Sequence, residues 1–99
     1  MVKHVVMWKV KDTKQGTKEE NIQKAKELLE ALKEKITAIS SLQVGLNFST
    51  RPVAFDLVLI TEHKDMEALK DYQEHPEHKK VADFIGEVKL ETAVVDFTY

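Results

Sequence analysis

The sequence contains no cysteine among its 99 residues. This absence excludes a disulfide framework and any thiolate metal site. No apolar run approaches the roughly 20 residues that a membrane span needs, and no secretory signal opens the sequence. The net charge is only −2, with lysines scattered among acidic residues, so nothing indicates a nucleic-acid-binding surface. We therefore expect a cytoplasmic protein that binds neither membrane nor nucleic acid.

The composition that remains is that of a globular protein. Hydrophobic residues make up 42% of the chain and charged residues 32%, a balance that favours a folded core over disorder. A chain of this length is at the small end of what folds alone. We expect one domain spanning residues 1–99.

Hydrophobic periodicity predicts four strands and two helical regions. The strands are expected at 2–11, 42–48, 54–62 and 90–99. Thr17 and Glu20 form a capping-box pair ahead of the first helix, whose apolar stripe continues to Ile36. The second helical region begins near Asp65 and carries an apolar stripe to Val88. The order is therefore βαββαβ.

This order is typical of a ferredoxin-like α+β sandwich, in which the helices cover one face of an antiparallel sheet. The strands at 2–11, 54–62 and 90–99 are nevertheless apolar on both faces. An uncovered apolar face would form a large exposed patch, which monomeric proteins avoid. We therefore predict a homodimer whose two sheets pack face to face around a two-fold axis.

The segment 71–78, Asp-Tyr-Gln-Glu-His-Pro-Glu-His, interrupts the second helical region. Proline fits the first turn of a helix but not its interior. We expect one helix to end near Glu74, His75 to cap the next helix, and that helix to begin at Pro76. Tyr72 and His78 then point from different helices towards one shared space.

The first strand sends His4 and Trp8 towards the same space, because alternate residues share a face. Buried polar groups need hydrogen-bond partners, so His4, Tyr72 and His78 bond one another, the backbone or a ligand. Two histidines and a phenol suit general acid–base chemistry near neutral pH. The alternative is a core cluster in which these side chains only satisfy each other.

The remaining histidines and Tyr99 give weaker indications of a functional site. His75, Glu77 and His78 could also be interpreted as a metal cluster. Two residues three apart on a helix, such as His75 and His78, need a third, convergent ligand, and none is evident except His4, so we predict no metal. We expect His63 to be solvated in a strand-to-helix turn and Tyr99 to pack at the dimer edge.

Three stretches together carry a family resemblance. Val-Lys-His-Val-Val at 2–6, the segment 71–78 and Val-Val-Asp-Phe at 94–97 resemble the stress-responsive dimeric α/β-barrel (Dabb) family, in order and over nearly the whole chain. The resemblance implies a ferredoxin-like protomer and a barrel-shaped dimer. Many members have no assigned activity.

One type within that family is a plant polyketide cyclase, olivetolic acid cyclase, which needs no cofactor and closes its product by an aldol condensation. Its active-site residues match His4, Tyr72 and His78 here. Trp8 stands where that cyclase has a smaller aliphatic residue, which implies a narrower pocket. Some family members also hold a cation through main-chain carbonyls, which would fall at 33–39 here.

We thus expect either a small-molecule site or a non-catalytic, stress-related structural or interaction module whose histidine and tyrosine cluster only stabilises the fold. The site would be lined by His4, Trp8, Tyr72 and His78, with His75 as a further ligand-binding candidate. It would bind a small hydrophobic ligand and catalyse a polyketide-cyclase-like or lyase reaction without a cofactor. An open cavity of a few hundred Å³ between helices and sheet would favour the site.

Overall fold

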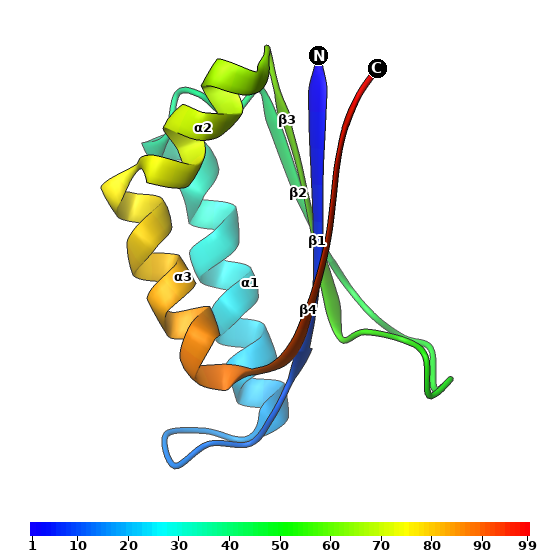
Figure 1. The fold of residues 1–99 in the computed structure, drawn as a ribbon. Helices are drawn as coiled ribbons and strands as arrows, with labels where there is room; N and C mark the ends of the chain where they lie inside the picture. Colours follow the sequence, from blue (N-terminus) through cyan, green and yellow to red (C-terminus); the bar gives the residue numbers. More distant parts are fainter.

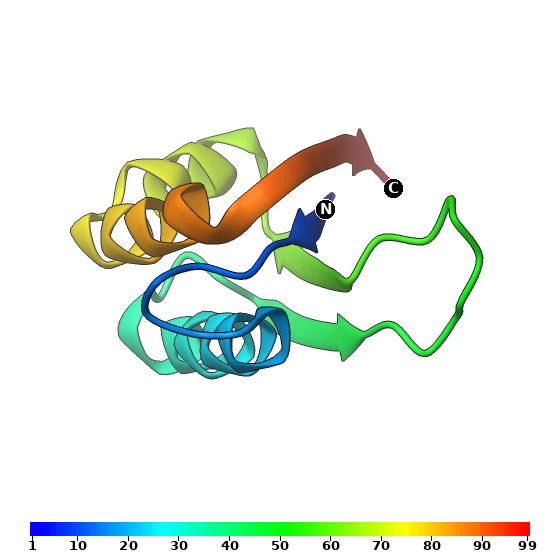
Figure 2. The same cartoon turned by 90° about the horizontal axis from the view of Figure 1, so that it is seen from below.

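A computed structural model describes all residues from Met1 to Tyr99. The elements are β1 (Val2–Val10), α1 (Lys18–Lys35), β2 (Ser41–Leu46), β3 (Leu57–His63), α2 (Met66–Glu74), α3 (Pro76–Val88) and β4 (Lys89–Thr98). The strands form one antiparallel sheet in the order β2-β3-β1-β4. All three helices lie on the same side of this sheet (Figures 1 and 2). The predicted ferredoxin-like α+β fold is confirmed.

The first helix begins where its cap predicts. Thr17 accepts a hydrogen bond from the Glu20 backbone amide, and the Glu20 carboxylate accepts one from the Thr17 amide. The helix buries Ala25, Leu29 and Leu32 against the sheet. Burial of such side chains is the main source of helix stability in a protein of this size.

The second helical region divides at the proline, as expected. His75 has extended backbone angles (φ −65°, ψ 135°) and separates α2 from α3. Its Nδ1 accepts a hydrogen bond from the Glu77 amide at 3.1 Å, and its own amide donates to the Tyr72 carbonyl at 3.2 Å. His75 thus caps both the end of α2 and the start of α3.

The hairpin between β2 and β3 differs from the prediction. Residues 47–56 leave the sheet as a long loop (Figures 1 and 2), and Phe48, expected on the buried face of a strand, is 98% exposed. The physical reason is local turn chemistry. Asn47 accepts a hydrogen bond from the Ser49 amide and donates one to the Ser49 carbonyl, which turns the chain away from the sheet.

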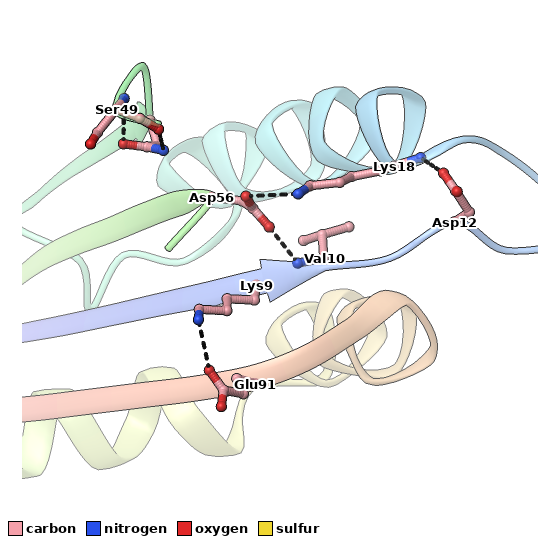
Figure 3. A network of polar contacts seen from close by, with 8 residues as sticks. Lys9, Val10, Asp12, Lys18, Ser49, Asp56 and Glu91 are labelled. Carbon is pink, nitrogen blue, oxygen red and sulfur yellow. Dashed lines mark hydrogen bonds and ion pairs between the residues drawn. The ribbon is translucent and has the colours of Figure 1, made fainter. Parts of the chain in front are cut away.

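Asp56 fixes the C-terminal end of β1 (Figure 3). Its carboxylate accepts a hydrogen bond from the Val10 amide at 2.7 Å and forms an ion pair with Lys18 Nζ at 3.2 Å (Figure 3). Asp12 in turn accepts from the Lys18 backbone amide at 2.6 Å. These bonds join the end of β1, the start of α1 and the start of β3, and so hold the strand that carries His4 and Trp8.

No helix covers the face of the sheet opposite α1, α2 and α3 (Figure 1). Val95 is 59% exposed and Phe97 is 43% exposed, and in the register they lie beside Val5 and Lys3 of β1. The expected second apolar face is therefore present. No helix has both the length and the apolar character that crossing a membrane requires.

Candidate active site

A cavity of about 270 Å³ lies between the helices and the sheet. Four of the five predicted site residues line it, namely His4, Trp8, Tyr72 and His78. The fifth, His75, is not part of the lining, and its imidazole is engaged as the helix cap. The polar residues of the lining are His4, Tyr72, Gln73, His78, Lys89 and Thr92. The structure thus brings together the residues that the sequence placed on one strand and two helices.

Tyr72 lies at the centre of the polar cluster. Its side chain is fully buried, and its hydroxyl has no hydrogen-bond partner in the protein. Burial raises its pKa to about 12, because removal from water disfavours the phenolate. Near neutral pH, Tyr72 therefore keeps its proton and can donate a hydrogen bond.

His78 lies against the Tyr72 ring, with 4.6 Å between ring centroids and an edge-on geometry. Its Nδ1 is buried and has no hydrogen-bond partner. Burial lowers its pKa below the ordinary value of 6.5; a weak hydrogen-bonding interaction with the Gln73 backbone partly opposes this, while the charges of His4 and His75 add to it. The imidazole is therefore neutral near pH 7, the state in which it can accept a proton.

His4 approaches the same cluster from β1, with its ring centroid 6.1 Å from that of Tyr72. It is only 6% exposed, and its Nδ1 forms a hydrogen bond with the Asp96 carboxylate of β4. Sequence reasoning did not identify Asp96 as a site residue. The signal lies in the strand register, which sets Asp96 directly opposite His4, and a strand register cannot be read from a single strand's alternation.

The prediction for His63 was wrong. This side chain is fully buried, with its two nitrogens 2.9 Å from the Ala38 carbonyl and 2.8 Å from Thr61 Oγ1. Its ring packs against Tyr72 with 5.0 Å between centroids. The reason is that β3 continues to His63, so strand alternation carries this residue inward with Leu59 and Thr61. Both ring nitrogens of His63 therefore have hydrogen-bond partners, and the ring packs against Tyr72 as part of the core.

Trp8 forms part of the apolar wall and is 8% exposed. It lies on the same buried face of β1 as His4, as the strand alternation predicted. Elsewhere, no three His, Asp or Glu side chains are arranged to hold a metal ion. The main-chain cation site at 33–39 stays a prediction; the Ala38 carbonyl in that segment bonds His63.

The arrangement combines three chemical functions in a mostly apolar cavity. A neutral imidazole can accept a proton, a protonated phenol can donate to a developing negative charge, and a carboxylate-bonded imidazole can exchange a second proton. A metal is not needed for any of these steps.

Comparisons with known proteins agree with this geometry. The family model described as "Stress responsive A/B Barrel Domain" (Dabb) matches residues 2–99. An uncharacterised protein of Streptomyces coelicolor is 33% identical over 79 residues, which cover 80% of each chain. A dimeric protein of unknown function with a ferredoxin-like fold from Bacteroides fragilis is 32% identical, covering 99% of this chain and 95% of that chain, with a TM-score of 0.84. A hydroxynitrile lyase from Passiflora edulis shares the fold at 12% identity, covering 97% and 90%, with a TM-score of 0.81.

Proposed function

The chain belongs to the stress-responsive α/β barrel (Dabb) family, and from that premise we propose that it is a cofactor-independent acid–base catalyst. Its reaction is proton abstraction next to the carbonyl group of a small substrate, leading to carbon–carbon bond formation or cleavage. His78 is the base, Tyr72 the hydrogen-bond donor to the oxyanion, and His4 with Asp96 the second acid–base group.

The observation that carries this proposal is the pair of buried polar atoms without partners, Tyr72 Oη and His78 Nδ1. Both residues line the same cavity. A cluster that served only the fold would satisfy its polar groups, because an unpaired buried group costs about 1–3 kcal/mol. His63 shows this structural arrangement in the same cluster, since both of its nitrogens are bonded. The contrast argues against the purely structural alternative.

The proton-transfer step follows from the protonation states. The unprotonated nitrogen of neutral His78 takes the proton from the carbon beside the substrate carbonyl. The electron pair of that C–H bond moves into the enolate, and its charge develops on the carbonyl oxygen. The Tyr72 hydroxyl donates a hydrogen bond to this oxygen. The enolate carbon then attacks a second carbonyl carbon, whose oxygen takes a proton from the imidazolium; the reverse sequence cleaves the bond.

The size of the cavity bears on the substrate class. Ligand pockets span roughly 300–1,000 Å³, and this cavity of about 270 Å³ lies just below that range, with Trp8 in its wall. We infer a substrate smaller than a polyketide thioester. The hydroxynitrile lyase of the same fold supports a lyase-type reaction on a small molecule.

We also propose that the protein works as a homodimer. The apolar face that carries Val95 and Phe97 is exposed in a single chain, and such a face favours association. The Bacteroides fragilis relative is described as dimeric. Two sheets packed face to face would bury both patches at once.

Hydrogen–deuterium exchange measures the proposed step directly. Aliphatic ketones and oxo acids of four to ten carbons are incubated with the protein in D₂O, and loss of the α-proton signal is followed by proton NMR. The wild type should accelerate exchange above buffer for at least one probe. His78→Ala should lose about 10²- to 10⁴-fold, and Tyr72→Phe about 10²-fold.

The control variant is Lys79→Met, because Lys79 is exposed on α3, outside the cavity lining and without an ion-pair partner. It should exchange at the wild-type rate. Absence of exchange in every probe, together with a loss of more than about 2 kcal/mol of stability in His78→Ala, would identify the cluster as structural.

A further inference from the structure

Lys89 is the one side chain with a permanent charge in the cavity lining. The chain carries 17 aspartate and glutamate residues, yet none of them is among the fourteen lining residues. A cavity with low-dielectric walls and charge of one sign concentrates ligands of the opposite sign. The charge balance of this cavity is therefore opposite to that of the chain as a whole.

The Lys89 ammonium is free to meet a ligand. Five other lysines form ion pairs with carboxylates, whereas Lys89 forms none. Its backbone is fixed, because Lys89 is the cap residue of α3 and its amide donates to the Ile85 carbonyl. A free charge on a fixed backbone position suits ligand recognition better than a charge held in an ion pair.

Lys89 and the acid–base cluster stand at opposite ends of the cavity. The α3 residues in the lining run from His78 to Gly86, a distance of about 12 Å along the helix axis. On the sheet side, the register sets Asp96 beside His4 but Lys89 beside Val10. Figure 1 shows the same direction, since α3 runs from the α2 junction down to the turn into β4. The cavity is thus elongated, with chemistry at one end and a cation at the other.

The Lys89 end is open to solvent. A Cβ atom added at Gly86 would meet nothing within 4 Å, and Ala82, Gly86 and Lys89 are exposed although they line the cavity. The other end holds the buried Tyr72 and the Asp96 carboxylate bonded to His4, which disfavours a second anion there.

We propose that Lys89 is a specificity-determining residue that selects substrates with a carboxylate at the end remote from the reacting carbonyl. The substrate class is therefore a slim aliphatic oxo acid, whose carboxylate pairs with Lys89 at the mouth while its carbonyl reaches Tyr72 and His78. This assignment rests on the proposed acid–base function for the identity of the reacting end, but the charge recognition itself is a binding property.

Matched probes test the assignment. 5-Oxohexanoate, 7-oxooctanoate and 9-oxodecanoate are compared with their methyl esters, by chemical-shift perturbation for binding and by α-proton exchange for turnover. Lys89→Met keeps an unbranched side chain of nearly the same length and removes its charge, and Lys79→Met makes the same change on α3 away from the cavity. The wild type should bind at least one carboxylate about fivefold more tightly than its ester. Lys89→Met should abolish this preference, and Lys79→Met should keep it.

The outcomes separate the two proposals. If wild type binds carboxylates preferentially without exchanging their protons, the recognition by Lys89 stands and the catalytic proposal fails. If wild type binds neither member of any pair, binds ester and carboxylate equally, or loses its preference in Lys79→Met as much as in Lys89→Met, the assignment of Lys89 is overturned. Added salt should also weaken the carboxylate preference, because the contact is ionic and near solvent.

Discussion

Replacing Tyr72 with phenylalanine should make the protein more stable and less active. The Tyr72 side chain is fully buried, and its hydroxyl has no partner. Burying an unpaired hydroxyl costs about 1–3 kcal/mol, while phenylalanine keeps the ring that contacts His63 and His78. We expect the free energy of unfolding to rise by about 1–2 kcal/mol. For a domain of this size, each kcal/mol raises the melting temperature by about 4–8 °C.

Urea unfolding, followed by the fluorescence of Trp8, measures this change. Trp8 is the only tryptophan of the chain and lies in the cavity wall, so its emission reports on the relevant region. Protein concentration must be the same for all variants, because association would add to the apparent stability. Tyr99→Phe is the contrasting variant, because the Tyr99 hydroxyl is exposed and donates a hydrogen bond to the Glu62 carboxylate, so its removal should leave stability unchanged or lower it by up to about 1 kcal/mol.

A loss of more than about 1 kcal/mol in Tyr72→Phe would refute this reasoning, because it would mean that the hydroxyl has a stabilising partner in the folded protein. A gain in stability combined with slower proton exchange would identify Tyr72 as a residue that costs stability in return for function.

Three further results are expected. His75→Ala should cost about 0.5–2 kcal/mol, because it removes the cap of α3; thermal melting measures the loss, and an unchanged melting temperature would contradict the assigned cap. Stability should fall as pH drops below about 6.5, because burial lowers the pKa of His63 and of His78, so the unfolded chain binds more protons there; urea midpoints at pH 7.5 and 5.0 test the sign, and a higher midpoint at pH 5.0 would refute it. Val95→Asp should produce a monomer of 11.4 kDa, because it sets a charge on the exposed apolar face; light scattering measures the mass, and a variant that stays dimeric would exclude this face as the interface.

The helix boundaries in this chain were predictable because their causes are local. The capping box at Thr17 and the proline at 76 act on neighbouring residues through hydrogen bonds and ring geometry, and both set the boundaries that the structure shows. Alternation within β1 likewise placed His4 and Trp8 on the helix side, since a strand's two faces follow from its own backbone. These inferences needed no knowledge of distant segments.

The pairing of His4 with Asp96 depended instead on which residues of two distant strands lie opposite each other. These residues are 92 positions apart, and only the register of β1 with β4 brings them together. The same holds for His63, whose burial follows from the Ala38 carbonyl and Thr61 closing around it. The prediction for Phe48 was wrong in the opposite sense: its alternation predicted a buried strand residue, but it is exposed. The turn at Asn47 takes it out of the strand.

The sequence by itself determined the element order, the break at Pro76 and the face on which His4, Trp8, Tyr72 and His78 lie, because each depends on periodicity or on short-range backbone chemistry. Only the tertiary structure decided that these side chains enclose a cavity rather than fill it, and that two polar atoms in it lack partners. Empty volume and hydrogen-bond satisfaction are properties of all packed elements together, so no single segment of the chain encodes them.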